Sequence, residues 1–273
     1  IVDEERGIGM EKKFLFFDID GTLTTGGMGS FIPDSARNTL KALKKNGHVV
    51  AIATGRPYAM SKDVAKDLEI DSFICNGGNT VVYEGEKIYN EPLDQAHVKE
   101  LLRECIAFGF PYCISQADDF FFLTKDMKAL PKLDNDFLSQ FIQEADFDPE
   151  HLTQVKRLMI YVNKEEQKKL TSFPDLVPQR YDDAYVMIEP DDKFKGIKKM
   201  MEILKEPIED VVVFGDGEND IKMFQQAPIS IAVGNAIDEL KALASYVTDR
   251  SDEDGIQKAC LHFGWISPED ISK

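Results

Sequence analysis

Acidic and hydroxyl side chains follow three apolar stretches of this sequence, at the point where each stretch ends. FLFF runs into Asp18 and Asp20, VVVF runs into Gly215 and Asp216, and HVVAIA runs into Thr54. An unpaired carboxylate at the edge of an apolar core is expensive to desolvate. Acids in these positions therefore indicate a functional site rather than ordinary packing.

The chemistry open to such a site is narrow. Carboxylates that converge without a cation repel one another and raise each other's pKa values. Mg²⁺ removes that cost, takes few protein carboxylates and leaves room for phosphate oxygens. One aspartate can then attack phosphorus, and a second can protonate the leaving alcohol and later deprotonate water. With a lysine and the Thr54 hydroxyl to hold the phosphoryl oxygens, the pattern predicts phosphoryl transfer with Mg²⁺ as cofactor.

The elements that must position these residues alternate between apolar strand patterns and helical patterns. The expected strands cover 12–18, 48–54, 72–75, 211–214 and 229–233, and the expected helices cover 33–45 and 57–68 or begin near 195, 219 and 236. Near-continuous apolar strands separated by helices predict a doubly wound parallel α/β sheet covered on both faces. Such sheets bind ligands outside the carboxyl ends of their strands, where the acids stand.

The pattern of strand-like and helix-like segments changes in the middle of the chain. EGEK at 84–87 predicts a hairpin turn, 95–108 reads as an amphipathic helix, and short strand-like pieces then follow closely. Bunched strands with helices between them predict an α+β unit with an antiparallel sheet. We expect a cap domain of this kind at 83–188, inserted into a core domain formed by 10–82 and 189–273. Residues 1–9, which precede Met10, are interpreted as a leader or cloning remnant.

Composition limits the partners and the compartment. The 273 residues suit two domains, and 49 acidic against 32 basic residues give a net charge of −17. That charge repels nucleic acid and anionic membranes, so we expect neither as a partner. No apolar run approaches the roughly 18 residues that span a bilayer. The four scattered cysteines predict reduced structural thiols and a cytoplasmic protein.

Four short segments carry a family resemblance. DIDGT (18–22), TGR (54–56), KG (195–196) and GDGEND (215–220) occur in this order, with the long insertion between the second and the third. In this arrangement the chain from Met10 onward resembles the haloacid dehalogenase (HAD) superfamily of aspartyl-phosphate phosphatases. The insertion resembles the cap of its Cof-type (type IIB) branch, which includes sugar phosphatases. The resemblance implies a Mg²⁺-dependent phosphomonoester hydrolase whose partner is a small phosphorylated metabolite, such as a sugar phosphate.

The resemblance also implies roles for individual residues. Asp18 is the implied nucleophile and metal ligand. Asp20 is the implied general acid/base and ligates the metal through its backbone carbonyl, and Asp216 is the third metal ligand. The implied phosphate-binding residues are Ile19, Thr54, Gly55, Lys195 and Asn219, and the supporting residues are Asp220 and Arg56. Lys193 stands two residues before Lys195, but Lys195-Gly196 matches the family pattern better.

Other interpretations stay open at this point. A phosphomutase similar to phosphomannomutase shares this core and cap, and a non-catalytic phospho-acceptor or binding module also uses acids at strand ends around Mg²⁺. Thr54 can simply cap the next helix, and Asp220 can be a solvated acid favoured by a helix dipole. The sequence names neither the substrate nor the oligomeric state.

Overall fold

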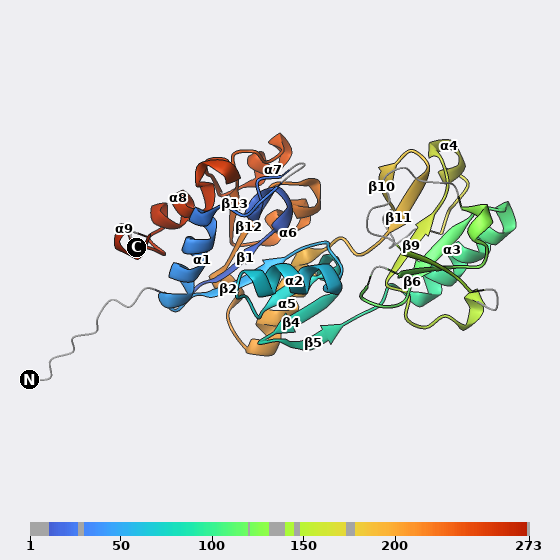
Figure 1. Ribbon diagram of the computed structural model, residues 1–273, viewed down its shortest axis with the longest axis horizontal. Helices are drawn as coiled ribbons and strands as arrows, with labels where there is room; N and C mark the ends of the chain where they lie inside the picture. The colour runs from blue at the N-terminus through green and yellow to red at the C-terminus, as the bar shows by residue number, and fades with distance from the viewer. Residues whose placement is uncertain are drawn as a thin grey trace, which may run out of the picture.

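Two lobes, each with its own β-sheet, make up the chain (Figure 1). The computed structural model describes residues 11–26, 30–119, 121–130, 140–144, 148–172 and 178–271. The predicted leader at 1–9 lies outside this described part. We call the lobe that holds β1 the large lobe and the lobe that holds β6 the small lobe.

The sheet of the large lobe has the described strand order β14-β13-β12-β1-β2-β3-β4-β5. Its strands are β1 (Phe14–Phe17), β2 (Val49–Ala53), β3 (Phe73–Cys75), β4 (Thr80–Tyr83), β5 (Glu86–Asn90), β12 (Val211–Gly215), β13 (Ile229–Ala232) and β14 (Tyr246–Val247). From β14 to β3 neighbouring strands run parallel, whereas β4 and β5 add an antiparallel hairpin.

Helices cover both faces of this sheet. They are α1 (Asp34–Lys45), α2 (Tyr58–Asp67), α5 (Lys193–Leu204), α6 (Ile221–Gln226), α7 (Asp238–Leu243), α8 (Gly255–His262) and α9 (Pro268–Ile271). Alternate residues of β1 point to opposite faces: Leu15 and Phe17 pack with α1 and α8, and Phe14 and Phe16 pack with α5 and α6. This double burial explains the unbroken apolar strand sequences and confirms the predicted fold class.

The edge hairpin crosses the boundary that the sequence predicted at residue 83. Tyr83 pairs with Glu86 across the two-residue turn at Glu84 and Gly85, both at positive φ. That turn geometry suits a tight hairpin and returns the chain as β5 to the same sheet. The large-lobe sheet therefore extends to Asn90, seven residues beyond the expected boundary position, because the hairpin keeps β5 paired with β4.

The small lobe contains the other sheet, whose described strand order is β10-β11-β9-β6-β7-β8. Its strands are β6 (Tyr112–Ser115), β7 (Phe121–Thr124), β8 (Gln140–Gln143), β9 (Arg157–Ile160), β10 (Pro178–Asp182) and β11 (Tyr185–Ile188), and its helices are α3 (Gln95–Phe108) and α4 (Lys164–Gln167). The pairs are antiparallel except β7 with β8. Leu101 and Cys105 of α3 pack on Leu158 and Val186 of the sheet. Among the described helices, none has the length and apolar character to cross a membrane.

Candidate active site

Three neighbouring strands deliver polar side chains to one edge of the large sheet. β12, β1 and β2 lie side by side and parallel, so their carboxyl ends meet. Asp18 follows β1, Thr54 follows β2, and Asp216 follows β12. The structure therefore brings together residues that are almost 200 positions apart in the sequence.

A buried lysine joins two of the acids at this edge. Lys193 Nζ donates to Asp18 Oδ1 and to Asp220 Oδ1, each at 2.6 Å. All three side chains are almost completely shielded from solvent. Asp220 Oδ2 also accepts the backbone N–H groups of Asp216 at 3.0 Å and Gly217 at 3.1 Å. Asp220 is thus a fully bonded internal residue that holds both the lysine and the loop after β12, not a solvated acid.

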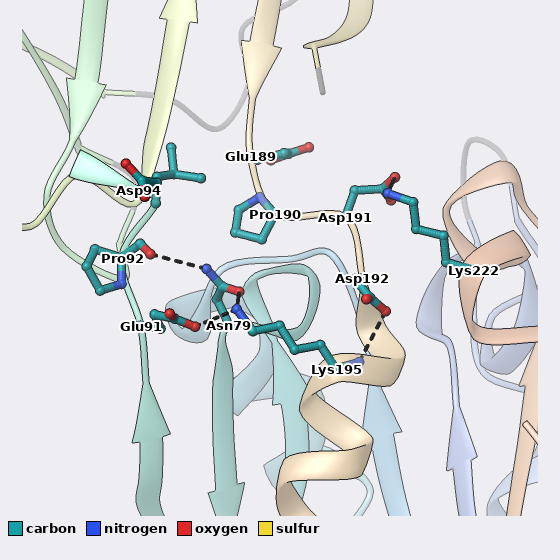
Figure 2. A pocket seen from close by; sticks show the side chains of 11 residues that line it. Asn79, Glu91, Pro92, Asp94, Glu189, Pro190, Asp191, Asp192, Lys195 and Lys222 are labelled. Carbon is teal, nitrogen blue, oxygen red and sulfur yellow. Dashed lines mark hydrogen bonds and ion pairs between the residues drawn. The ribbon is translucent and has the colours of Figure 1, made fainter. Parts of the chain in front are cut away.

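Lys195, the lysine that the sequence pattern favoured, lies elsewhere. Figure 2 shows its ammonium group beside Glu91 and Asn79, in a cavity of about 460 Å³ lined largely by the two segments that connect the lobes. Its Nζ donates to Asn79 Oδ1 at 3.1 Å and pairs with Glu91. Residues two apart on a helix do not share a face, so only one of the two lysine side chains of α5 can point toward Asp18. The structure gives that position to Lys193, so Lys195, which was predicted to bind the phosphoryl group, lies outside the buried cluster at Asp18.

Asp216 is held by the turn that follows Asp18. Its Oδ1 accepts the hydroxyl of Thr22 at 2.8 Å, and its carbonyl accepts Ile237 N–H at 2.9 Å. Gly21 has φ +85°, and a β-carbon there would overlap Asp216 Oδ2. Glycine is therefore required twice at this position, for its backbone conformation and for the close approach of the carboxylate. Thr22 was not among the predicted site residues, although it belongs to the DIDGT segment.

Asp20 is bound by an arginine instead of joining the buried acids. Arg56 Nε donates to Asp20 Oδ2 at 2.8 Å and Arg56 Nη2 donates to Asp20 Oδ1 at 2.5 Å. The Asp20 side chain is 60% exposed, so its carboxylate lies at the open side of the site. The hydrogen bond to Asp20 raises the pKa of Arg56, against the opposing effect of burial. Two parallel N–H···O bonds fix the orientation of both groups.

The remaining predicted residues surround the same edge. Thr54 is buried, its N–H donates to Ile74 O at 3.0 Å, and its Oγ1 accepts Arg56 N–H at 3.1 Å. A β-carbon on Gly55 would lie 3.9 Å from Asn219 Nδ2, which places Asn219 across from the TGR segment. The carbonyl of Ile19 accepts Thr24 N–H at 2.9 Å, which closes the turn Ile19–Leu23 behind Asp18.

Burial first, and the surplus of negative charge second, shift the pKa values of the acids in this cluster. Burial raises the pKa of Asp18 to about 7; Lys193 opposes this shift, whereas Asp220 and Asp216 add to it. Burial also raises the pKa of Asp216 to about 6, against the hydrogen bond from Thr22. For Lys193 burial acts to lower the pKa, but Asp18 and Asp220 outweigh it and raise the pKa above its usual value. Among the described residues, the cluster holds three carboxylates and a single ammonium group, that of Lys193. The charge of the cluster therefore allows a second cation to bind.

The donor set fits a hard divalent cation. Carboxylate oxygens of Asp18, Asp216 and Asp220 lie within 4.8 Å of one another. Both oxygens of Asp220 are already engaged by Lys193 and two backbone amides, so the carboxylates of Asp18 and Asp216 are the ones left to bind a metal. Two carboxylates with room for further oxygen ligands match the preference of Mg²⁺.

Comparison with known proteins gives a consistent set of matches. A family model described as haloacid dehalogenase-like hydrolase matches residues 15–260. The protein YkrA of Bacillus subtilis strain 168 is 33% identical over 263 residues, which cover 94% of this chain and 100% of that protein. Phosphoglycolate phosphatase 1 of Saccharolobus solfataricus is 28% identical over 249 residues, covering 90% of this chain and 93% of the relative.

Solved structures resemble the whole chain as well. A protein of Geobacillus kaustophilus matches with a TM-score of 0.82 and 30% sequence identity, covering 94% of this chain and 100% of that one. The solved structure of the HAD subclass IIB sugar phosphatase BT4131 matches with a TM-score of 0.74 and 33% identity, covering 93% of this chain and 100% of that one. The similarity therefore extends over both lobes and not over the large sheet alone.

Proposed function

The chain belongs to the haloacid dehalogenase-like hydrolases and is a phosphatase, and we propose that it hydrolyses phosphomonoesters of small metabolites with Mg²⁺ through an aspartyl-phosphate on Asp18. The observation that carries this proposal is the Asp18–Lys193–Asp220 arrangement with Asp216 beside it. It supplies a buried carboxylate nucleophile, one fixed cation and a place for another.

The proposed chemical steps use Asp18 as the nucleophile and Asp20 as the acid and base. An oxygen of Asp18 attacks phosphorus, the bond from phosphorus to the ester oxygen breaks, and Asp20 gives its proton to the departing alcohol. Asp20 then takes a proton from a water whose oxygen attacks phosphorus, and the bond from phosphorus to the Asp18 oxygen breaks, which releases phosphate and restores the Asp18 carboxylate. Bound at Asp18 and Asp216, Mg²⁺ would offset the charge that phosphate oxygens bring to these carboxylates.

Residues around the nucleophile assist without reacting themselves. Lys193 keeps Asp18 oriented and offsets its charge, while Thr54, Gly55, Ile19 and Asn219 offer hydrogen-bonding groups around the phosphoryl position. Arg56 holds the carboxylate of Asp20 at the open side of the site through its two hydrogen bonds. This division of roles keeps the proton-transfer group separate from the buried nucleophile.

The substrate class that we propose is a small phosphorylated metabolite, such as a sugar phosphate. The small lobe is joined to the large lobe through residues 91–94 and 189–192, so it can lie over the carboxyl edge and leave space only for a small leaving group. The similarity to the structure of the sugar phosphatase BT4131 supports this class.

The test is phosphate release from p-nitrophenyl phosphate and a panel of sugar phosphates, with and without Mg²⁺, by the wild type and by Asp18→Asn. We expect Mg²⁺-dependent release that falls by at least about 10³-fold in the variant, because the nucleophile is removed. Exchange of phosphoryl groups between sugar positions without net release would indicate a mutase. Absence of both from a folded, Mg²⁺-loaded wild type would contradict the proposal.

A further inference from the structure

A loop of the small lobe docks on the large lobe through Asp118, three residues after the end of β6. The Asp118 side chain is 8% exposed. Its Oδ1 accepts Asn76 Nδ2 at 2.7 Å, its Oδ2 accepts Lys87 Nζ at 2.8 Å, and its carbonyl accepts Ala59 N–H at 3.0 Å. One acid of the small lobe therefore binds the large lobe at three separate points.

Two of these points border the phosphate-binding segment. Asn76 N–H donates to Arg56 O at 2.8 Å, and the next residue, Gly77, donates its N–H to Thr54 O at 3.2 Å. Ala59 is the second residue of α2, whose first-turn amides lack partners within the helix. Asp118 thus binds Ala59, three residues after Arg56, and the side chain of Asn76, whose backbone N–H binds the Arg56 carbonyl.

The docking extends into a buried chain of hydrogen bonds. Thr80 Oγ1 accepts Asn76 Nδ2 at 2.9 Å and donates to Asn90 Oδ1 at 2.9 Å. Asn90 Oδ1 also accepts Lys156 Nζ at 2.7 Å, and Lys156 belongs to the small lobe. This series of hydrogen bonds therefore begins and ends in the small lobe and passes through the large lobe. Separating the lobes would break these hydrogen bonds at both ends and leave buried polar groups without partners, which costs free energy.

The docking loop is itself attached firmly to the small lobe. Arg157, the first residue of β9, is buried and donates Nη2 to the carbonyl of Asp119 and to Ser115 Oγ. These bonds tie the residues on both sides of Asp118 to the small-lobe sheet. The position of Asp118 therefore follows the position of the small lobe.

We propose that Asp118 is a positioning residue that completes the active site when the small lobe docks. Through Asn76 and Ala59 it fixes the backbone around Arg56, and Arg56 in turn holds Asp20 for proton transfer. This inference rests on the proposed function, since it assigns Asp20 the role of acid and base. It predicts that loss of the Asp118 carboxylate impairs turnover more than substrate binding.

Kinetics of three variants test the proposal with p-nitrophenyl phosphate and Mg²⁺. Asp118→Ala is expected to lower kcat roughly 3- to 30-fold, the range of coupling through packed networks, with a smaller change in KM. Asp118→Asn keeps an oxygen that can accept Asn76 Nδ2 and is expected to recover most of kcat. The control is Asp119→Ala, because the Asp119 carboxylate accepts only the local Phe121 N–H among the described hydrogen bonds. It should leave both constants near wild type.

A second readout does not depend on catalysis. In hydrogen–deuterium exchange without substrate, the segment 57–64 should exchange faster in Asp118→Ala, because the Ala59 amide loses its acceptor when the loop undocks. The Asp119→Ala control should show wild-type exchange in this segment. If the wild type fails to release phosphate, the proposed function fails while this local change in exchange still reports the docking.

Several results would overturn the positioning role. Unchanged exchange at 57–64 in Asp118→Ala would show that the carboxylate does not hold this segment. A loss confined to KM, or an equal loss of kcat in the Asp119→Ala control, would remove Asp118 from turnover. Should Asp118→Ala raise exchange throughout the chain, Asp118→Asn decides the matter: near-normal kcat and protection support the role, and a loss equal to that of Asp118→Ala contradicts it.

Discussion

The ammonium group of Lys193 lies 2.6 Å from the Asp18 carboxylate, and both side chains are almost completely buried. Because Asp220 binds the same ammonium group from the other side, the cation is fixed without help from solvent. Any phosphate that reaches Asp18, the proposed nucleophile, therefore meets a carboxylate whose orientation is already set. This preorganisation reduces the reorganisation needed when charge develops at phosphorus.

Removing the Lys193 cation should be far more damaging than removing that of Lys195. Lys193→Met leaves two buried carboxylates without their ammonium partner, and breaking a buried pair costs about 3–5 kcal/mol of the free energy of unfolding. Lys195→Met is the matched control from the same helix; its ion pair with Glu91 is 43% exposed at the lysine and is worth at most ~1 kcal/mol. Urea unfolding and phosphate release measure both effects. Equal losses in the two variants would contradict the assignment of Lys193 to the site.

The free energy of unfolding of the metal-free protein should decrease as the pH rises from 5 to 8, because the pKa values of Asp18 and Asp216 are raised in the folded state. The folded-state pKa values are about 7 for Asp18 and about 6 for Asp216, above the ordinary value of 3.8 in both cases. In this window the native state binds more protons than the unfolded state, so stability decreases as pH rises. The raised pKa of Lys193 adds no slope here, since the lysine stays charged in both states over this range.

The measurement for this pH effect is urea unfolding in EDTA at several pH values. The difference between wild type and Asp216→Asn isolates the contribution of Asp216, and the variant should show a flatter decline from pH 5 to pH 7. Adding Mg²⁺ should restore wild-type stability most strongly at the upper end of the range, where both acids are ionised. A wild-type stability that rises steadily over this range, with no difference in slope from the variant, would contradict the raised pKa values.

Substitution of Gly21 should disturb the site beyond the effect of backbone strain. Gly21→Ala places a methyl group on Asp216 and also forces φ +85° on alanine, so we expect a loss of ~2 kcal/mol or more together with weaker Mg²⁺-dependent activity. Gly47→Ala is the control, because Gly47 has φ +87° with nothing within 4 Å of the added carbon. Gly47→Ala should lower the free energy of unfolding only by the cost of backbone strain, roughly 1–2 kcal/mol, and should retain activity. Thermal unfolding and phosphate release distinguish the two variants.

Replacing Arg56 by lysine should lower turnover although the charge is kept. Lysine cannot reproduce the two parallel hydrogen bonds that Arg56 makes to Asp20, so the acid loses its fixed orientation. We expect kcat to fall about 10-fold, a part of the roughly 10²–10⁴-fold that general acid–base catalysis typically contributes. Burst kinetics with p-nitrophenyl phosphate should place the loss in leaving-group departure or in hydrolysis of the intermediate. Wild-type kcat in Arg56→Lys would show that the bidentate geometry is not needed.

The sequence by itself determined the sheet and the residues at its edge. Apolar runs such as 14–17 and 211–214 are continuous because both faces of their strands are covered, and parallel pairing then brings Asp18 and Asp216 together. These features follow from local pattern and from the rule that parallel strands end at the same edge.

Only the tertiary structure decided which side chains complete the site. The packing of Phe194 and Ile197 sets the rotation of α5 about its axis, and this rotation points Lys193 instead of Lys195 toward Asp18. The antiparallel pairing of β5 carried the large sheet past residue 83, and the docking of the two lobes brought Asp118 to Asn76. Spacing along the chain carries no information about a helix's rotation or about contacts between lobes, because both are fixed by the packing of elements distant in the sequence.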